Sequence, residues 1–489
     1  MNLASFFFFV VFLSVSFPAN AQTPALAIVT RDEAALRAAA RGSAPAHAVL
    51  RQGETLEVRG ERLEYRQVYD HGRVRAGFVR AADVRRLELR PQDAPELLSV
   101  VRFLRGSPGN EALGIGLVAA YLRAAPAEAL NGEAGVEALD SLGTFADRLA
   151  QRASAGAGPQ AALSAHLEVA RRYGVGFVSA ERGGRVRVCY DGEAFGRVLA
   201  MRSTPEQRAR AALALTRPEC LSDELHPAGR RRVDEWRAEV LDRVEVEALA
   251  GYLKNRIRMR RAAVWSALAY QLARGGDAGE AAAARALAEM AGVDRSELAH
   301  EDARSYAEAA MRVNASRWAS VAAPAGAPDK GPRLVAVPGA PGETCLLLLD
   351  ARRGPANPLA RRCTYGIAWM ASASVNREGS ALALAVQQAE AWRELWIFRK
   401  TASGWNVRAL PPAAAAPEVG YAEFAGWVPG GAQILVAREA LAEGKLKRRF
   451  ELMRLDTLAV VRQAGEPDAL GAFQRWQDPS WKQHTLAMR

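Results

Sequence analysis

Residues 50–84 constrain the fold most, because short β-type runs alternate there with residues that turn the chain. A first run is expected to break at Gly60, since glycine weakens a strand interior. Two further runs, residues 65–69 and 75–79, flank the turn Asp70-His71-Gly72. This alternation predicts a small antiparallel meander near the N-terminus, with the rest of the chain attached to it as a larger body.

Three short motifs in this region resemble those of the bacterial SH3-like domain family. They are Leu36-Arg37-Ala38, then Val49-Leu50-Arg51-Gln52-Gly53, and finally Gly77-Phe78-Val79. The resemblance covers residues 26–90, under a fifth of the chain. It implies a small five-stranded β-barrel, here placed at residues 23–90, and a role in binding cell-wall material. A barrel that only acts as a spacer is the alternative.

Aromatic side chains are the candidate ligand-binding residues of this module, because aromatic anchors contribute most of the binding energy at many interfaces. We expect Tyr65, Tyr69 and Phe78 to form the binding surface. For Phe78 a place in the core is also open, since its strand alternates between Ala76 and Arg80 without fixing which face is buried.

The N-terminus predicts export. Residues 6–17 form an apolar run of the length of a signal-peptide core, and Ala19-Asn20-Ala21 is a cleavage pattern of small residues. Residues 1–22 are therefore interpreted as a signal peptide. No later stretch is long and apolar enough to span a membrane. The expected location is the periplasm or the medium outside the cell.

The net charge of +11 invites a nucleic-acid interpretation, which two observations oppose. The predicted export would place the protein outside the compartment that holds nucleic acid. The basic residues are also interleaved with Asp and Glu instead of forming a tail. We therefore expect no nucleic acid as a partner. An envelope protein or a cell-wall polymer is the expected partner, and the positive charge favours anionic surfaces.

The four cysteines fit an oxidising compartment. They form two local pairs, and we predict the disulfides Cys189–Cys220 and Cys345–Cys363. A zinc site is the alternative interpretation. It is disfavoured because the sequence has no Cys-x-x-Cys and no histidine near a second ligand in metal-binding spacing. No metal and no cofactor are predicted.

Residues 91–320 are predicted to form a mainly helical domain that contains one β-hairpin turning at Gly183-Gly184. Thr204 and Gln207 have the spacing of a capping box, which predicts a helix start. Residues 321–332, rich in Pro, Ala and Gly, are expected to be a linker between independently folded parts.

Residues 333–489 are predicted to form an all-β domain. Three units repeat a glycine turn followed by an apolar strand, beginning near Gly342, Gly379 and Gly431. They are similar to blades of periplasmic β-propellers of the TolB type, which implies propeller-like strands. Three units are too few to close a ring, so an open sheet or a sandwich stays open as an alternative. The whole chain is thus predicted to be a multidomain α+β protein.

The sequence predicts no catalytic residues. It lacks the nucleophile elbow, the zinc-protease motif, the phosphate-binding loop and a dinucleotide fingerprint after a strand. We therefore expect an exported, non-catalytic binding or scaffold protein of the bacterial cell envelope. A peptidoglycan hydrolase, or an activator of one, with an unrecognised active site is the alternative.

Overall fold

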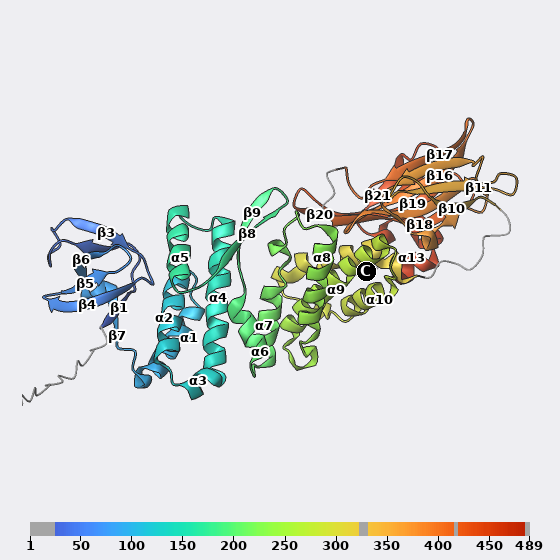
Figure 1. Cartoon of the computed structure of the whole chain (residues 1–489). Helices are drawn as coiled ribbons and strands as arrows, with labels where there is room; N and C mark the ends of the chain where they lie inside the picture. Colours follow the sequence, from blue (N-terminus) through green and yellow to red (C-terminus); the bar gives the residue numbers. More distant parts are fainter. Residues whose placement is uncertain (1–24, 322–330, 415–418, 485–489) are drawn as a thin grey trace, which may run out of the picture. The chain divides into compact units, whose positions relative to one another are not determined.

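A computed structural model shows a chain of mixed α and β structure (Figure 1). The predicted signal peptide, residues 1–22, lies outside the described residues, as does nearly all of the predicted linker at 321–332. The structure describes residues 25–321, 331–414 and 419–484.

Contacts divide the chain into two compact units. The first runs to Val178 and includes Val188–Asp191; the second comprises Ser179–Arg187 and the chain from Gly192 onward. The predicted order of an N-terminal sheet, a helical middle and a β-rich C-terminal part is confirmed. The helical middle is shared between the two units, because its first five helices pack with the N-terminal sheet and its later helices with the C-terminal strands.

Seven strands form the N-terminal sheet. In spatial order they are β3 (Ala46–Leu50), β2 (Ala34–Arg37), β6 (Arg75–Arg80), β5 (Tyr65–Asp70), β4 (Thr55–Arg62), β1 (Leu26–Val29) and β7 (Val84–Leu87). The predicted meander is β4, β5 and β6. Gly60 does not end its strand as predicted; it lies at a bulge after Val58, and β4 continues to Arg62. The turn after β5 is held by Asp70, whose carboxylate accepts hydrogen bonds from the backbone N–H of Gly72 (2.9 Å) and Arg73 (3.1 Å).

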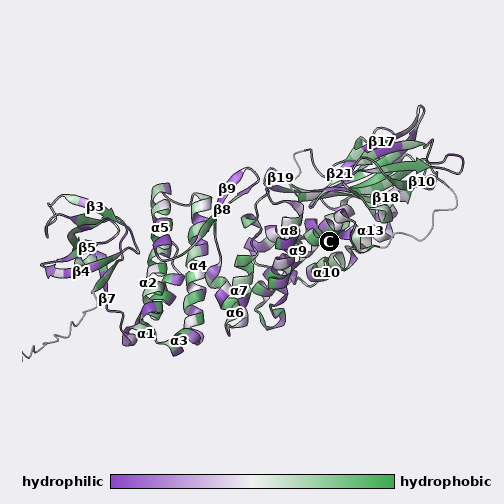
Figure 2. Cartoon of the chain, in the orientation of Figure 1, coloured by the Kyte–Doolittle hydropathy of each residue, from purple (hydrophilic) through white to green (hydrophobic). Residues whose placement is uncertain are grey.

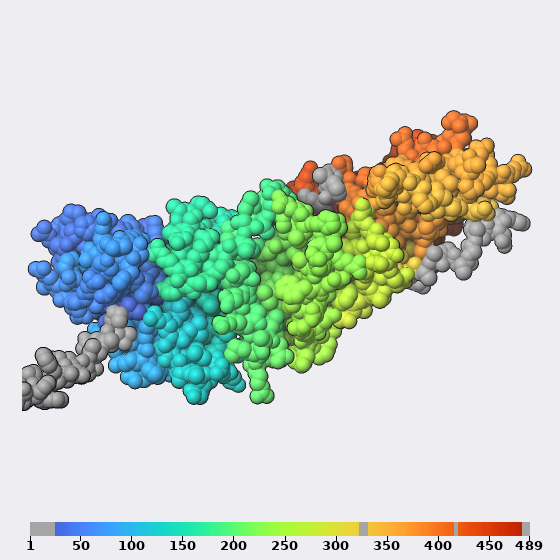
Figure 3. Space-filling view, viewed as in Figure 1, coloured from blue at the N-terminus to red at the C-terminus, as the bar shows by residue number. Residues whose placement is uncertain are grey.

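The sheet is open, with β3 and β7 at its two ends and no pairing between them among the described residues. The expected closed barrel of five strands is therefore not formed. Strand β7 pairs antiparallel with β1, with Val29 opposite Val84. It therefore extends the sheet at that end and does not pair with β3 within the described residues. One face buries a cluster of small apolar side chains that includes Leu36, Leu56 and Val68. Figure 3 shows this sheet as the blue part of the surface.

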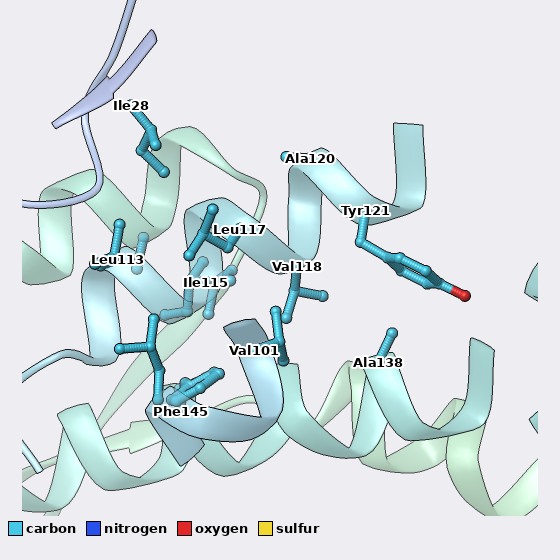
Figure 4. Close-up of a cluster of buried hydrophobic side chains, with 14 of the residues drawn as sticks. Ile28, Val101, Leu113, Ile115, Leu117, Val118, Ala120, Tyr121, Ala138 and Phe145 are labelled. Atoms are coloured by element: carbon cyan, nitrogen blue, oxygen red, sulfur yellow. The ribbon is translucent and has the colours of Figure 1, made fainter. Parts of the chain in front are cut away.

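Five helices complete the first unit: α1 (Ala94–Arg105), α2 (Glu111–Ala124), α3 (Ala127–Asn131), α4 (Glu133–Ala155) and α5 (Gln160–Arg172). Two glycines on α2 allow close packing. A Cβ atom on Gly114 would lie 2.5 Å from the ring of Phe145 on α4, and one on Gly116 would lie 2.7 Å from Ile28 on β1. Figure 4 shows Ile28 beside the apolar side chains of α2. The sheet and the helices of this unit thus share one core.

Six helices of the second unit precede its C-terminal strands in the described chain: α6 (Glu193–Ala200), α7 (Pro205–Leu215), α8 (Pro227–Asp242), α9 (Gly251–Gly275), α10 (Glu280–Ala291) and α11 (Ala303–Ser316). The predicted capping box opens α7: Thr204 Oγ1 accepts from the N–H of Gln207 (3.2 Å), and the Gln207 side chain accepts from the N–H of Thr204 (2.8 Å). The predicted hairpin is also confirmed, with Gly183 and Gly184 both at positive φ between its strands, β8 (Phe177–Arg182) and β9 (Arg185–Tyr190).

The C-terminal part is β-rich, as predicted, and no described sheet closes into a ring. Three strands form a small sheet: β10 (Arg333–Pro338), β11 (Thr344–Leu349) and β12 (Ala360–Thr364). A nine-stranded sheet contains β13 (Ile367–Ala368), β14 (Ser374–Val375), β15 (Ala381–Ala389), β16 (Trp392–Thr401), β17 (Gly404–Leu410), β18 (Val419–Val428), β19 (Gln433–Ala442), β20 (Lys445–Arg454) and β21 (Val460–Ala464). Two short helices follow, α12 (Gly471–Trp476) and α13 (Pro479–His484). Figure 2 shows green, hydrophobic residues among the strands of this C-terminal part.

The nine-stranded sheet bends back on itself between β16 and β18. These two strands pair in parallel over only two residue pairs, Trp392 with Gly420 and Arg393 with Tyr421. Farther along β16, the Arg399 guanidinium donates to the carbonyl of Leu455, just after β20, at 2.9 Å. An arginine cannot reach past two intervening strands of a flat sheet spaced about 4.8 Å apart. Apolar residues of β15 and β16 therefore face those of β18, β19 and β20.

Short 3-10 helices connect many of these elements: η1 (Ala81–Asp83), η2 (Pro91–Asp93), η3 (Pro218–Cys220), η4 (Val246–Ala248), η5 (Arg295–Glu297), η6 (His300–Asp302), η7 (Arg317–Ser320), η8 (Met370–Ser372) and η9 (Pro467–Ala469). One of them, η7, continues α11 and places Arg317 beside β18. Met311 on α11 is fully buried in the core formed by β18, β19 and β20. The last helix of the helical middle is therefore part of the C-terminal core.

Candidate functional site

The three aromatic residues predicted as a ligand surface are divided by the structure. Tyr65 begins β5 with only 2% of its surface exposed. Its hydroxyl contacts the Arg80 guanidinium at 3.4 Å and lies near the loop that carries Gly42. Tyr65 is therefore a packing residue and does not offer a surface to a ligand.

Tyr69 and Phe78 come together on the outward face of the meander. Tyr69 lies opposite Ala76 in the β5–β6 pairing, and Phe78 lies opposite Gln67, so the two aromatic residues are diagonal neighbours. Both are partly exposed, and Gln67 beside them is exposed. We call Tyr69, Phe78 and Gln67 the aromatic surface. The alternative that Phe78 is a core residue does not fit its partial exposure.

Neighbouring charged groups hold the Tyr69 ring in place. The guanidinium of Arg59 on β4 lies 3.9 Å from the ring centroid, and the His71 ring meets it edge-on at 4.9 Å. Glu57 fixes both neighbours, because its carboxylate accepts from Arg59 (2.9 Å) and from His71 Nε2 (2.6 Å). These hydrogen bonds lower the pKa of Glu57. The result is an ordered aromatic ring surrounded by hydrogen-bonding groups.

A buried carboxylate holds the meander that carries this surface in position. Glu54 is 5% exposed and accepts two hydrogen bonds of 2.9 Å from Arg73, which also donates to Asp70 at 2.6 Å. The hydrogen bond with Glu54 raises the pKa of Arg73 despite its partial burial. These hydrogen bonds of Arg73 connect the β5–β6 turn to the residue before β4. They therefore fix the strands that carry the aromatic surface.

The predicted disulfide Cys345–Cys363 is present. Cys345 and Cys363 stand directly opposite each other on β11 and β12 and are bonded, and no described cysteine is free, since Cys189 and Cys220 are disulfide-bonded too. Glu343 lies close to Cys345 and Cys363, so these three residues have the spacing of metal ligands. Both sulfurs are bonded to each other, however, and a metal needs thiolates. We assign a structural role to these cysteines.

A network of buried charges in the C-terminal sheet was not predicted. Glu423 on β18 is 2% exposed and pairs with two arginines, Arg317 and Arg393, which are 4% and 0% exposed. Burial raises the pKa of Glu423, but the two guanidiniums outweigh that effect and leave it below its ordinary value. The available sequence signal was a single charged residue within an apolar run, as Glu423 is between Ala422 and Phe424.

A second buried carboxylate, Glu439 on β19, lies beside this network. It accepts a hydrogen bond from the Tyr421 hydroxyl at 3.1 Å and pairs with Arg448 at 3.3 Å. Here burial outweighs the attraction to Arg448, so the pKa of Glu439 is raised. The pKa is thus lowered for Glu423 and raised for Glu439, although both carboxylates are buried.

Comparisons of this chain with protein-family models, with curated proteins and with solved structures found no match. Within the described residues, none of the helices has the length and apolar character needed to cross a membrane. The interpretation of function therefore rests on the geometry of the chain itself.

Proposed function

We propose that this chain is an exported binding protein of the bacterial cell envelope, and that the aromatic surface of its SH3-like N-terminal sheet is the contact site. The observation that carries the proposal is the position of Tyr69. Its ring is partly exposed, and Arg59 and His71 hold it in one orientation. An ordered aromatic ring loses little conformational entropy on binding, which favours its use as an anchor.

A cell-wall polymer is the partner that this surface fits best. The flat ring of Tyr69 suits the apolar face of a sugar ring, and the neighbouring Gln67 amide offers hydrogen bonds to hydroxyl or amide groups. The resemblance to bacterial SH3-like domains implies the same class of ligand. An envelope protein is the second candidate, because exposed aromatic residues also anchor protein interfaces.

The proposal is tested by incubating the purified chain with purified peptidoglycan and measuring the fraction that sediments. Tyr69→Ala and Phe78→Ala are each expected to weaken binding about tenfold, the effect of losing one anchor worth 1–2 kcal/mol. Leu63→Ala is the matched control. Leu63 is a large apolar residue in the β4–β5 turn, 88% exposed and outside the aromatic surface, so its loss should not change binding.

Thermal melts separate binding from folding. The Tyr69 and Phe78 variants should keep the parent melting temperature, whereas Tyr65→Ala should lower it, because removing a buried aromatic side chain costs about 3–5 kcal/mol. Sedimentation that is unchanged in both surface variants would contradict the proposal. Binding to solubilised envelope protein but not to peptidoglycan would show that the ligand of the aromatic surface is a protein.

A peptidoglycan hydrolase remains the competing function, and zymography on the same material distinguishes the two. Binding without clearing supports a binding protein. Clearing of the peptidoglycan by the purified chain would replace the proposal with the hydrolase interpretation.

A further inference from the structure

A cavity in the second unit is built from charged residues that are almost completely buried. It has a volume of about 220 Å³ and lies where β15, β16 and β18 meet η7, η8 and the chain before α13. Arg317 and Glu423 line it, and both have less than a tenth of their surface exposed. A water molecule occupies about 30 Å³ of liquid, so the cavity has room for a small organic molecule of roughly seven such volumes.

One hydrogen-bond donor of the lining is unused. Arg317 directs Nε (3.2 Å) and Nη2 (3.1 Å) to Glu423, whereas its Nη1 makes no hydrogen bond within the described residues. The guanidinium carbon of Arg317 lies 4.2 Å from the centre of the Trp318 ring, so this ring, next along η7, covers one face of the guanidinium. A buried donor without a partner costs about 1–3 kcal/mol, and a ligand with acceptor oxygens would remove that cost.

A carboxylate faces the cavity from another segment. Asp478 uses one oxygen, Oδ1, to accept from the N–H (2.8 Å) and Oγ (2.6 Å) of Ser480, and Oδ2 has no partner among the described residues. A bulge in β18 positions this aspartate: the carbonyl of Ala425 accepts from the N–H of Asp478 at 2.7 Å. Gly426 permits that approach, because a Cβ there would lie 2.2 Å from the carbonyl oxygen of Trp476.

The charges around the cavity fit a ligand that carries both signs. Arg317 and Arg393 share the single carboxylate of Glu423, which leaves one positive charge in excess on that side. Asp478 supplies one negative charge on the other. A purely anionic or purely cationic ligand would leave one of these groups unpaired, at a cost in a buried site. A neutral zwitterion leaves neither.

We propose that this cavity binds a free α-amino acid with a small side chain. Its carboxylate accepts from Arg317 Nη1, its ammonium group donates to Asp478 Oδ2, and Phe424 supplies an apolar wall for the side chain. This site is separate from the aromatic surface on the N-terminal sheet, and it would make the C-terminal part a sensor or carrier of amino acids in the envelope.

The test is isothermal titration calorimetry of the full chain with L-alanine and D-alanine. Acetate and methylammonium serve as probes that carry only one of the two charged groups. We expect at least one alanine enantiomer to bind and both single-group probes to bind at least about tenfold more weakly, because each lacks one charge-assisted contact.

One conservative variant examines the ammonium contact. Asp478→Asn keeps the Ser480 hydrogen bonds while removing the charge, and it should weaken alanine binding about tenfold. The matched control, Asp456→Asn, changes an exposed residue outside the cavity lining and should bind like the parent. Melting temperatures equal to that of the parent show that the variants are folded.

The outcomes are distinct. Failure of both alanine enantiomers to bind at millimolar concentration would overturn the proposal. Acetate that binds as tightly as alanine would reduce the cavity to an anion site and overturn it as well. Alanine binding that is unchanged in Asp478→Asn would place the amino acid elsewhere and overturn the proposal.

Discussion

Replacing Glu423 by glutamine is expected to destabilise the C-terminal sheet strongly. The substitution keeps the size of the side chain and removes the carboxylate that pairs with both Arg317 and Arg393. Breaking a buried ion pair by neutralising one partner costs about 3–5 kcal/mol, because the remaining charge stays desolvated. Two guanidiniums lose their partner here, so we expect the upper half of that range.

Glu439→Gln is the matched control for this prediction. Glu439 is as buried as Glu423, but burial dominates its environment and raises its pKa. Its ionised form is therefore not stabilised by folding, and glutamine retains an oxygen that can accept from Tyr421. We expect a change of about 1 kcal/mol or less for Glu439→Gln.

The two carboxylates also predict opposite pH dependences. The pKa of Glu423 is lowered by folding, so its contribution to stability is present above the unfolded-state pKa of about 4.3 and is lost as pH falls through the folded-state pKa. The difference between the parent and Glu423→Gln should shrink on acidification. The pKa of Glu439 is raised, so its contribution is present below the unfolded-state pKa and is lost as pH rises through the folded-state pKa.

Hydrogen exchange of the β16 and β18 amides, followed by mass spectrometry, measures the effect locally in the full chain. At neutral pH, Glu423→Gln should speed exchange through these strands by about three to four orders of magnitude. Glu439→Gln should stay within about one order of magnitude of the parent. Equal effects of the two substitutions, or a Glu423→Gln variant indistinguishable from the parent, would refute the reasoning.

Three further predictions concern the framework. Mass spectrometry of non-reduced peptides should recover Cys189 linked to Cys220 and Cys345 linked to Cys363, and links between the pairs would contradict this. A fragment of residues 331–489 lacks Met311 and Arg317, so it should be at least about 3 kcal/mol less stable to urea than a fragment of residues 303–489; equal stability would show that α11 and η7 are dispensable. Gly114→Ala should destabilise the first unit by about 1–3 kcal/mol, because its Cβ would lie 2.5 Å from Phe145. Gly196→Ala, with nothing within 4 Å, should instead stabilise α6 by up to about 1 kcal/mol, and the opposite order of the two glycine variants would reject this packing argument.

The local elements of this chain could be predicted from the sequence because each has its own short-range cause. The Gly183-Gly184 turn needs positive φ, which glycine adopts readily, and Thr204 with Gln207 satisfies backbone groups of its own helix. Cys345 and Cys363, which form a disulfide, are separated by only 18 positions. None of these features depends on what the distant chain does.

The arrangement of the sheets could not be predicted in this way. Closure of the N-terminal sheet depends on which strand β7 pairs with, and the pairing with β1 joins residues more than fifty positions apart. The burial of Tyr65 depends on the loop around Gly42, whereas alternation alone placed Tyr65 on the same face as Tyr69. The pairing of β16 with β18 joins residues more than twenty positions apart. The hydrogen bond from Arg317 to Glu423 joins residues more than one hundred positions apart.

Photo-crosslinking in cells tests the central claim most directly, because it reports what contacts the aromatic surface where the protein acts. Benzoylphenylalanine replaces Tyr69 in one variant and Leu63 in a control, and the products are digested with a muramidase before electrophoresis. Our account predicts a muramidase-sensitive adduct at position 69 and none at position 63. The absence of any adduct at position 69, or equal adducts at both positions, would contradict a binding role for this surface.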